Sequence, residues 1–87
     1  MNDLYLCLDW IEKNELIEDY NNYTIKRYGK KQYNAGEMLT SVKAFTIKTW
    51  EEKNPVLAGL LQKECLNYSH YLDEVMEAIE NELSNEP

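Results

Sequence analysis

An apolar stripe runs through the last third of the chain and constrains the fold more than any other feature. From Leu57 to Leu83, apolar side chains recur at spacings of four and three residues, which is the repeat of one helix face. Asn54 suits a helix N-cap and Pro55 suits the first helical position. The pattern predicts a long C-terminal helix over about residues 55–83, with 84–87 as a frayed tail. The stripe consists of Leu57, Leu61, Cys65, Tyr68, Leu72, Val75, Ile79 and Leu83, and Leu60, Tyr71 and Met76 widen it.

A second helix is predicted over about residues 37–53. Its apolar face contains Met38, Leu39, Val42, Phe45, Thr49 and Trp50. Ile47 does not lie on this face, and β-branched residues gather around it, so a strand over residues 44–50 is the alternative. The helix should stop before Pro55, because the residue before a proline is biased out of the helical region.

The first part of the chain breaks its own helical pattern. If one helix continued through this segment, it would have two apolar faces on nearly opposite sides. The first consists of Leu4, Cys7, Leu8 and Ile11, and the second of Leu16, Ile17, Tyr20 and Tyr23. A break near Lys13-Asn14 therefore predicts helices over about 3–13 and 15–23. Residues 24–36 contain glycine and asparagine, which favour turns, and we expect a short hairpin or a loop there. The predicted fold is all-α, a small bundle of three or four helices in one domain, 1–87.

Composition limits the class of protein. The chain has 87 residues, of which 44% are hydrophobic and 29% charged, as in ordinary globular domains. It has no apolar run long enough to span a membrane. The N-terminus lacks a basic n-region and is interrupted by Asp9, so we expect no signal peptide and a cytoplasmic location. Cys7 and Cys65 lie far apart in the sequence, and we expect two small buried side chains; a disulfide between them would need their Cα atoms within about 7 Å.

The charge is distributed as an acidic, a basic and a second acidic segment. The formal net charge is −7, with −5 over residues 1–25, +4 over 26–53 and −6 over 54–87. After Lys63 there is no further basic residue. This distribution excludes a generally basic nucleic-acid binder.

The residues that could carry chemistry are few. His70 is the only histidine and forms an i,i+4 pair with Glu74, but a zinc site normally needs more nitrogen or sulfur ligands. The sequence has no Gly-rich phosphate loop, no GxSxG motif and no cysteine–histidine spacing typical of a nucleophile. We therefore expect no catalytic residue, no metal site, no cofactor and no enzymatic activity.

Residues 23–33 mix basic and aromatic side chains, a combination that suits single-stranded nucleic acid. A nucleic-acid-binding accessory protein is therefore an alternative function. Its contacts would be Lys26, Arg27, Lys30 and Lys31. The flanking acidic segments would repel the same phosphate backbone, so we rank nucleic acid below a protein as the partner.

An acidic surface together with seven tyrosines, two tryptophans and one phenylalanine favours binding to a basic surface of another protein. Inhibitors, immunity proteins, antitoxins and DNA mimics use this kind of surface. We expect Glu74, Glu77 and Glu80 to steer the partner electrostatically. The candidate aromatic anchors are Trp10, Tyr20 and Tyr28.

The predicted C-terminal helix also suggests self-association. A helix over residues 55–83 would be about 43 Å long, whereas a compact domain of this size is about 30 Å across. Its far end would then carry an uncovered apolar stripe, consisting of Val75, Met76, Ile79 and Leu83. A second copy of the chain would cover this stripe, so the sequence predicts a homodimer. A structural, self-assembling subunit is a further alternative function.

Overall fold

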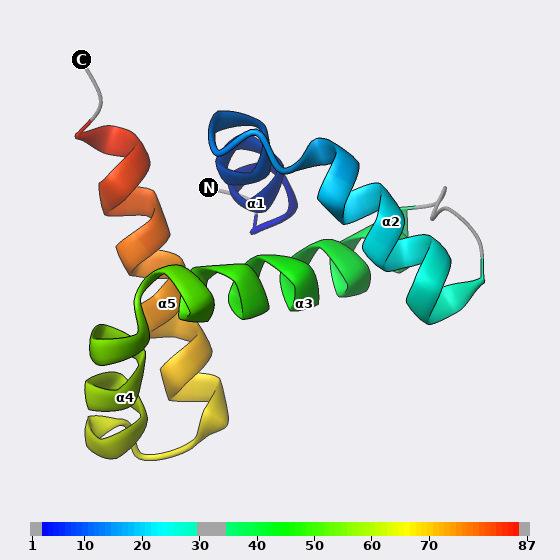
Figure 1. Cartoon of the computed structure of the whole chain (residues 1–87). Coiled ribbons are helices and arrows are strands. Elements are labelled where there is room, and N and C mark those ends of the chain that lie inside the picture. Colours follow the sequence, from blue (N-terminus) through cyan, green and yellow to red (C-terminus); the bar gives the residue numbers. More distant parts are fainter. Residues whose placement is uncertain (1–2, 30–34, 86–87) are drawn as a thin grey trace. The chain divides into compact units, whose positions relative to one another are not determined.

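The computed structural model describes residues 3–29 and 35–85, and this part of the chain is all-α, with five helices and no strand (Figure 1). The helices are α1 (Asp3–Lys13), α2 (Ile17–Tyr28), α3 (Ala35–Lys53), α4 (Pro55–Glu64) and α5 (Tyr68–Ser84). The predicted all-α class is confirmed, and the strand alternative over 44–50 is wrong. None of the described helices is long and apolar enough to cross a membrane.

The expected break between α1 and α2 is confirmed. The backbone N–H of Asn14 and its side-chain Nδ2 both donate to the carbonyl oxygen of Trp10, at 3.0 and 2.8 Å, and so close the last turn of α1. Glu15 takes the left-handed conformation, with φ 59°, and Leu16 N–H donates to Ile11 O at 2.9 Å. The left-handed position is therefore Glu15, one residue beyond the asparagine that suits it best.

Helix α2 is longer than predicted, so the hairpin or loop expected over 24–36 is wrong where the structure can test it. Residues 24–28 continue α2, and 35–36 begin α3. Thr24 is helical and buried, and its hydroxyl is satisfied within the helix because it donates to Asn21 O at 2.8 Å. Gly29 ends α2 with φ 78° and donates its N–H to Ile25 O. Residues 30–34 lie outside the described part of the chain.

The predicted C-terminal helix over 55–83 is wrong, because residues 65–67 divide it into α4 and α5. Cys65 is extended, and Asn67 becomes the N-cap of α5 by accepting the backbone N–H of His70 at 2.8 Å. Leu66 N–H donates to His70 Nδ1 at 3.3 Å. This break raises the number of helices above the three or four expected. Helix α5 extends through Ser84, so the tail predicted over 84–87 is wrong at its first residue, and residues 86–87 lie outside the described part of the chain.

The chain divides into two compact units, unit 1 (Met1–Thr46) and unit 2 (Ile47–Pro87), and α3 belongs to both. Phe45, Thr46 and Ile47 are consecutive and all buried, so α3 is covered on opposite faces. In unit 1, the rings of Tyr20 and Tyr23 pack on Phe45, with centroids 5.5 and 5.4 Å away. The buried residues of unit 2 are Ile47, Trp50, Ala58, Tyr71, Val75, Met76 and Ile79.

Candidate functional site

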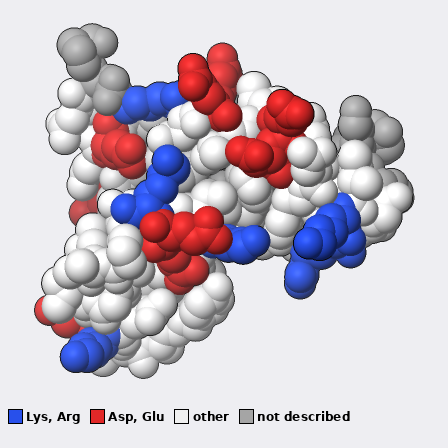
Figure 2. All heavy atoms as spheres, viewed as in Figure 1, with Lys and Arg blue, Asp and Glu red and all other residues white. Residues whose placement is uncertain are grey.

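Helix α4 of unit 2 exposes an apolar surface. Val56, Leu57 and Leu60, which we call the α4 apolar face, are 76%, 43% and 50% exposed. Ala58 is the one residue of α4 that is fully buried. Figure 2 shows a largely uncharged surface over this helix, at the lower left of the view. Apolar side chains gathered on one exposed surface are typical of a protein-binding site.

A shallow groove of about 390 Å³ lies at the start of α4. It is lined by Lys53, Asn54, Pro55, Val56, Leu57 and Leu60. The expected capping role of Asn54 is only partly correct, because its side chain makes no N-cap hydrogen bond. Instead its Nδ2 donates backwards to Trp50 O at 3.0 Å, which closes α3 immediately before Pro55 begins α4. The two helices therefore meet at a sharp corner, with the α4 apolar face beside it.

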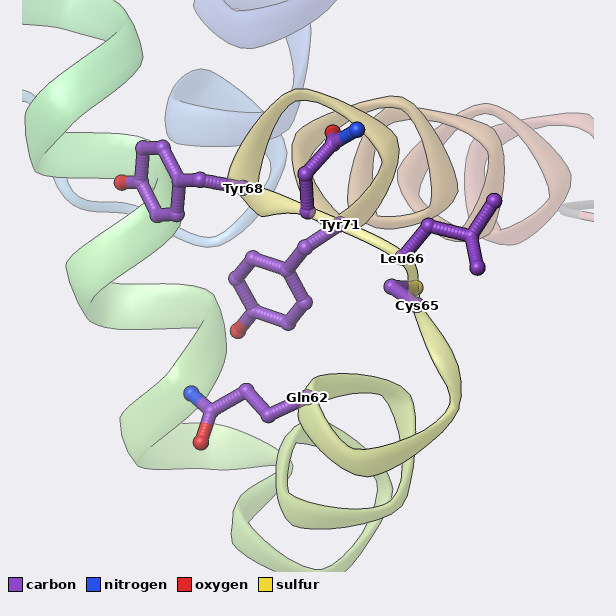
Figure 3. Close-up of a pocket in the computed structure, with 6 residues that line it drawn as sticks. Gln62, Cys65, Leu66, Tyr68 and Tyr71 are labelled. Atoms are coloured by element: carbon purple, nitrogen blue, oxygen red, sulfur yellow. The ribbon is translucent and has the colours of Figure 1, made fainter.

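A pocket of about 370 Å³ lies at the other end of α4, where the chain turns into α5 (Figure 3). Its lining residues are Gln62, Cys65, Leu66, Asn67, Tyr68 and Tyr71. Leu66 and Tyr68 are 90% and 68% exposed. Figure 3 shows Gln62 on α4 and Tyr71 on α5 with their polar ends turned toward one another. We call this feature the turn pocket.

The carboxylate of Glu51 on α3 binds two side chains that line the turn pocket, one on α4 and one on α5. Tyr71 OH on α5 donates to Glu51 Oε2 at 2.6 Å, and Gln62 Nε2 on α4 donates to the same oxygen at 3.3 Å. Burial raises the pKa of the Tyr71 phenol to about 12, and the hydrogen bond to Glu51 adds to this effect. The neutral phenol is therefore the form that this arrangement stabilises.

Unit 2 carries nearly all of the net charge. Its sequence contains nine acidic and three basic residues, a net charge of −6 out of −7. Glu77 and Glu80, which we expected to steer a partner, are exposed on α5. Glu74 is half-buried, and its Oε1 lies 3.5 Å from His70 Nε2. Within the described residues, no group of three or more histidine, cysteine, aspartate or glutamate side chains could hold a metal ion.

Two of the three predicted aromatic anchors are core residues. Trp10 is completely buried and Tyr20 is 8% exposed, with its hydroxyl 2.7 Å from Ser41 Oγ. They cannot reach a partner from the folded chain, which corrects the prediction. Tyr28 does present surface, and the Arg27 guanidinium lies 5.9 Å from the centre of its ring.

Of the four basic residues predicted to contact nucleic acid, the structure describes two. Lys26 and Arg27 are exposed in the last turn of α2. Lys30 and Lys31 lie outside the described residues. Figure 2 shows a cluster of basic side chains over the C-terminal end of α2, on the right of the view.

The residues expected to form a dimer interface are covered within the chain. Val75 and Ile79 are fully buried, Met76 is 6% exposed and Leu83 is half-buried. The argument for an overhanging helix is wrong, because the 17 residues of α5 span only about 25 Å. The homodimer itself stays a prediction, and its interface would have to lie on a different surface.

Neither cysteine takes part in a disulfide bond, and the two differ in exposure. Cys7 is buried as expected. Burial raises the pKa of its thiol, and a hydrogen bond with Thr46 acts in the opposite direction. Cys65 is half-exposed and lines the turn pocket, contrary to the prediction. Burial also raises the pKa of the Cys65 thiol, and the Glu74 and Glu64 carboxylates add to the rise.

Sequence reasoning missed the α4 apolar face and the turn pocket. The composition of α4 was the available signal for the face. Seven of its ten residues are proline, alanine, valine, leucine or glycine, and so short a helix cannot bury all of them, so some, such as Val56 and Leu60, had to be exposed. No comparable pattern marks the pocket. Comparison with protein-family models, curated proteins and solved structures finds no match to this chain. The case for a function therefore depends on the geometry of these surfaces.

Proposed function

We propose that this protein is a small, acidic, non-catalytic module that binds a partner protein having a basic surface. The observation that carries the proposal is the α4 apolar face, which leaves three large apolar side chains in water. Burying one such side chain in an interface is worth about 1.5–3 kcal/mol relative to leaving it exposed. A partner that covers α4 would recover this free energy.

The acidic residues of unit 2 support the choice of a basic partner. Glu77 and Glu80 are exposed on α5, and α5 contains no basic residue other than His70. Complementary charge of this kind speeds the encounter of two proteins more than it tightens the complex. Inhibitors, immunity proteins, antitoxins and DNA mimics that block nucleic-acid enzymes are the classes that fit the proposal.

The test compares two variants with the unmodified chain in affinity capture from the source cell. Leu60→Glu places a charge on the α4 apolar face, where Leu60 is 50% exposed. The control, Ile25→Glu, places a charge on unit 1 at a side chain of similar exposure, 47%. We expect one protein to be captured by the unmodified chain and by Ile25→Glu but not by Leu60→Glu. Equal capture by all three chains would contradict the proposal.

The purified partner then gives a second measurement. Its association rate should fall as salt is raised, because exposed charges are screened over about 8–10 Å at physiological ionic strength. Changing Glu77 and Glu80 to glutamine should slow association about threefold and leave dissociation nearly unchanged. Recovery of nucleic acid that depends on Lys26 and Arg27 would instead favour the nucleic-acid alternative.

A further inference from the structure

We propose that the turn pocket binds an arginine side chain of the partner protein. The inference rests on the proposed function, because it names the side chain by which a basic partner engages this same unit. It depends on the shape of the pocket, on its aromatic wall and on the carboxylates near its lining residues.

The wall of the turn pocket is aromatic. The ring centroids of Tyr68 and Tyr71 are 6.0 Å apart, with their planes tilted by 30°. Tyr68 is 68% exposed, so one face of its ring is available to a ligand. A planar guanidinium stacks on such a ring through cation–π and dispersion contacts. The volume of about 370 Å³ is near the lower limit for ligand pockets and suits a single long side chain.

Three carboxylates lie near residues that line the pocket, because Glu51 binds two of them and Glu64 and Glu74 act electrostatically on the Cys65 thiol. Glu51 binds both Tyr71 and Gln62 of the lining. Glu64 directly precedes Cys65 in the sequence. Glu74 is placed beside the turn by His70, whose Nε2 lies 3.5 Å from it while Nδ1 accepts the N–H of Leu66. A cation in the pocket would therefore be attracted by these carboxylates.

Arginine fits this pocket better than lysine does. The guanidinium offers five N–H donors in a fixed plane and can stack and donate at the same time. Lys63 does not fill the pocket itself, because it lies about 100° around α4 from Gln62.

The test titrates the isotope-labelled full-length protein with Nα-acetyl-arginine amide and follows the backbone amides by NMR. The control ligand is Nα-acetyl-citrulline amide, which has nearly the same shape and no charge. We expect saturable shifts at Leu66, Asn67 and Tyr68 with the arginine ligand and none with citrulline. The lysine analogue should bind about threefold more weakly. Equal shifts with citrulline, or shifts confined to the exposed acids of α5, would overturn the inference.

A matched pair of variants tests the aromatic wall. Tyr68→Leu should weaken binding of the arginine ligand about fivefold, whereas Tyr5→Leu, at a position 63% exposed in unit 1, should leave it unchanged. Unchanged binding by Tyr68→Leu would contradict the proposal. Capture of a partner that depends on Leu60 but not on Tyr68 would overturn this inference and leave the proposed function standing. Arginine binding without any captured partner would support the pocket and count against the proposed function.

Discussion

At the scale of single residues, Glu51 determines how three helices of unit 2 meet. One oxygen of its carboxylate accepts hydrogen bonds from Tyr71 on α5 and from Gln62 on α4. Hydrogen bonds to a charged group contribute about 1.5–3 kcal/mol, more than bonds between neutral groups. Tyr71 and Gln62 are 20 and 11 residues from Glu51 in the sequence, so no local spacing could have predicted that the three side chains meet.

Replacing Tyr71 by phenylalanine should reveal this bond. We expect the free energy of unfolding at pH 7 to fall by about 1–2 kcal/mol, because Glu51 loses its shortest hydrogen bond. The phenol has a pKa of about 12 in the folded protein, above its value of about 10 in an unfolded chain. Its contribution to stability is therefore complete below pH 10 and is lost as the pH rises through 12.

Urea unfolding followed by circular dichroism at pH 7 and pH 11 measures both effects. The difference in stability between the natural chain and Tyr71→Phe should be smaller at pH 11. Tyr5→Phe, at an exposed position, is the control and should change stability at pH 7 by less than about 0.5 kcal/mol. An equal loss in the two variants would contradict the role of Glu51.

At the scale of the elements, the periodicity predicted where helices lie better than where they end. The α1–α2 break was predictable because the apolar face changes sides after Ile11. The α4–α5 break was not, because Leu61, Cys65, Tyr68 and Leu72 keep the spacing of four and three through the turn. Asn67 was the available signal, since asparagine is a strong N-cap, but an asparagine inside a regular stripe does not by itself indicate a break.

Replacing a glycine by alanine should change the stability of the protein in opposite directions at two positions, Gly29 and Gly59. Gly29 has φ 78° at the end of α2, so Gly29→Ala forces an L-residue into the left-handed region and should cost about 1 kcal/mol. Gly59 lies inside α4 at an exposed position, and a Cβ there meets no atom within 4 Å. Gly59→Ala should therefore stabilise the protein by about 0.5–1 kcal/mol.

Thermal unfolding of the two glycine variants checks this prediction directly. The midpoint should fall for Gly29→Ala and rise for Gly59→Ala, by about 4–8 °C per kcal/mol in a chain of this size. A fall in both would show that residue 59 is not held in a helical conformation.

At the scale of the whole molecule, the sequence predicted the distribution of charge better than it predicted which aromatic side chains are exposed. The acidic character of residues 54–87 was evident, and it lies within unit 2. Trp10 and Tyr20 were chosen as surface anchors because aromatic residues are common at interfaces, yet the fold buries both. Periodicity put Tyr20, Phe45 and Trp50 on apolar faces, but it did not show whether the core or a partner covers such a face, because that depends on how the helices pack.

Self-association remains a prediction, and the α4 apolar face is the exposed surface on which we now expect it. If sedimentation equilibrium at tens of micromolar shows a dimer, Leu60→Glu should dissociate it to the 10.3 kDa monomer with its helicity retained. Ile79→Glu should instead unfold the chain, because it buries an unpaired charge at a fully buried position. A dimer that resists Leu60→Glu but dissociates with Leu83→Glu would restore the interface first expected from the sequence.

The boundary between the two units lies between Thr46 and Ile47, inside the continuous helix α3. This position restricts how the chain can change in length over evolution. One residue inserted there would turn every following side chain of α3, including Ile47 and Trp50, by about 100° relative to Phe45 and Thr46. Insertions and deletions between related chains should therefore gather at residues 14–16 and 65–67, and the length of α3 should be conserved.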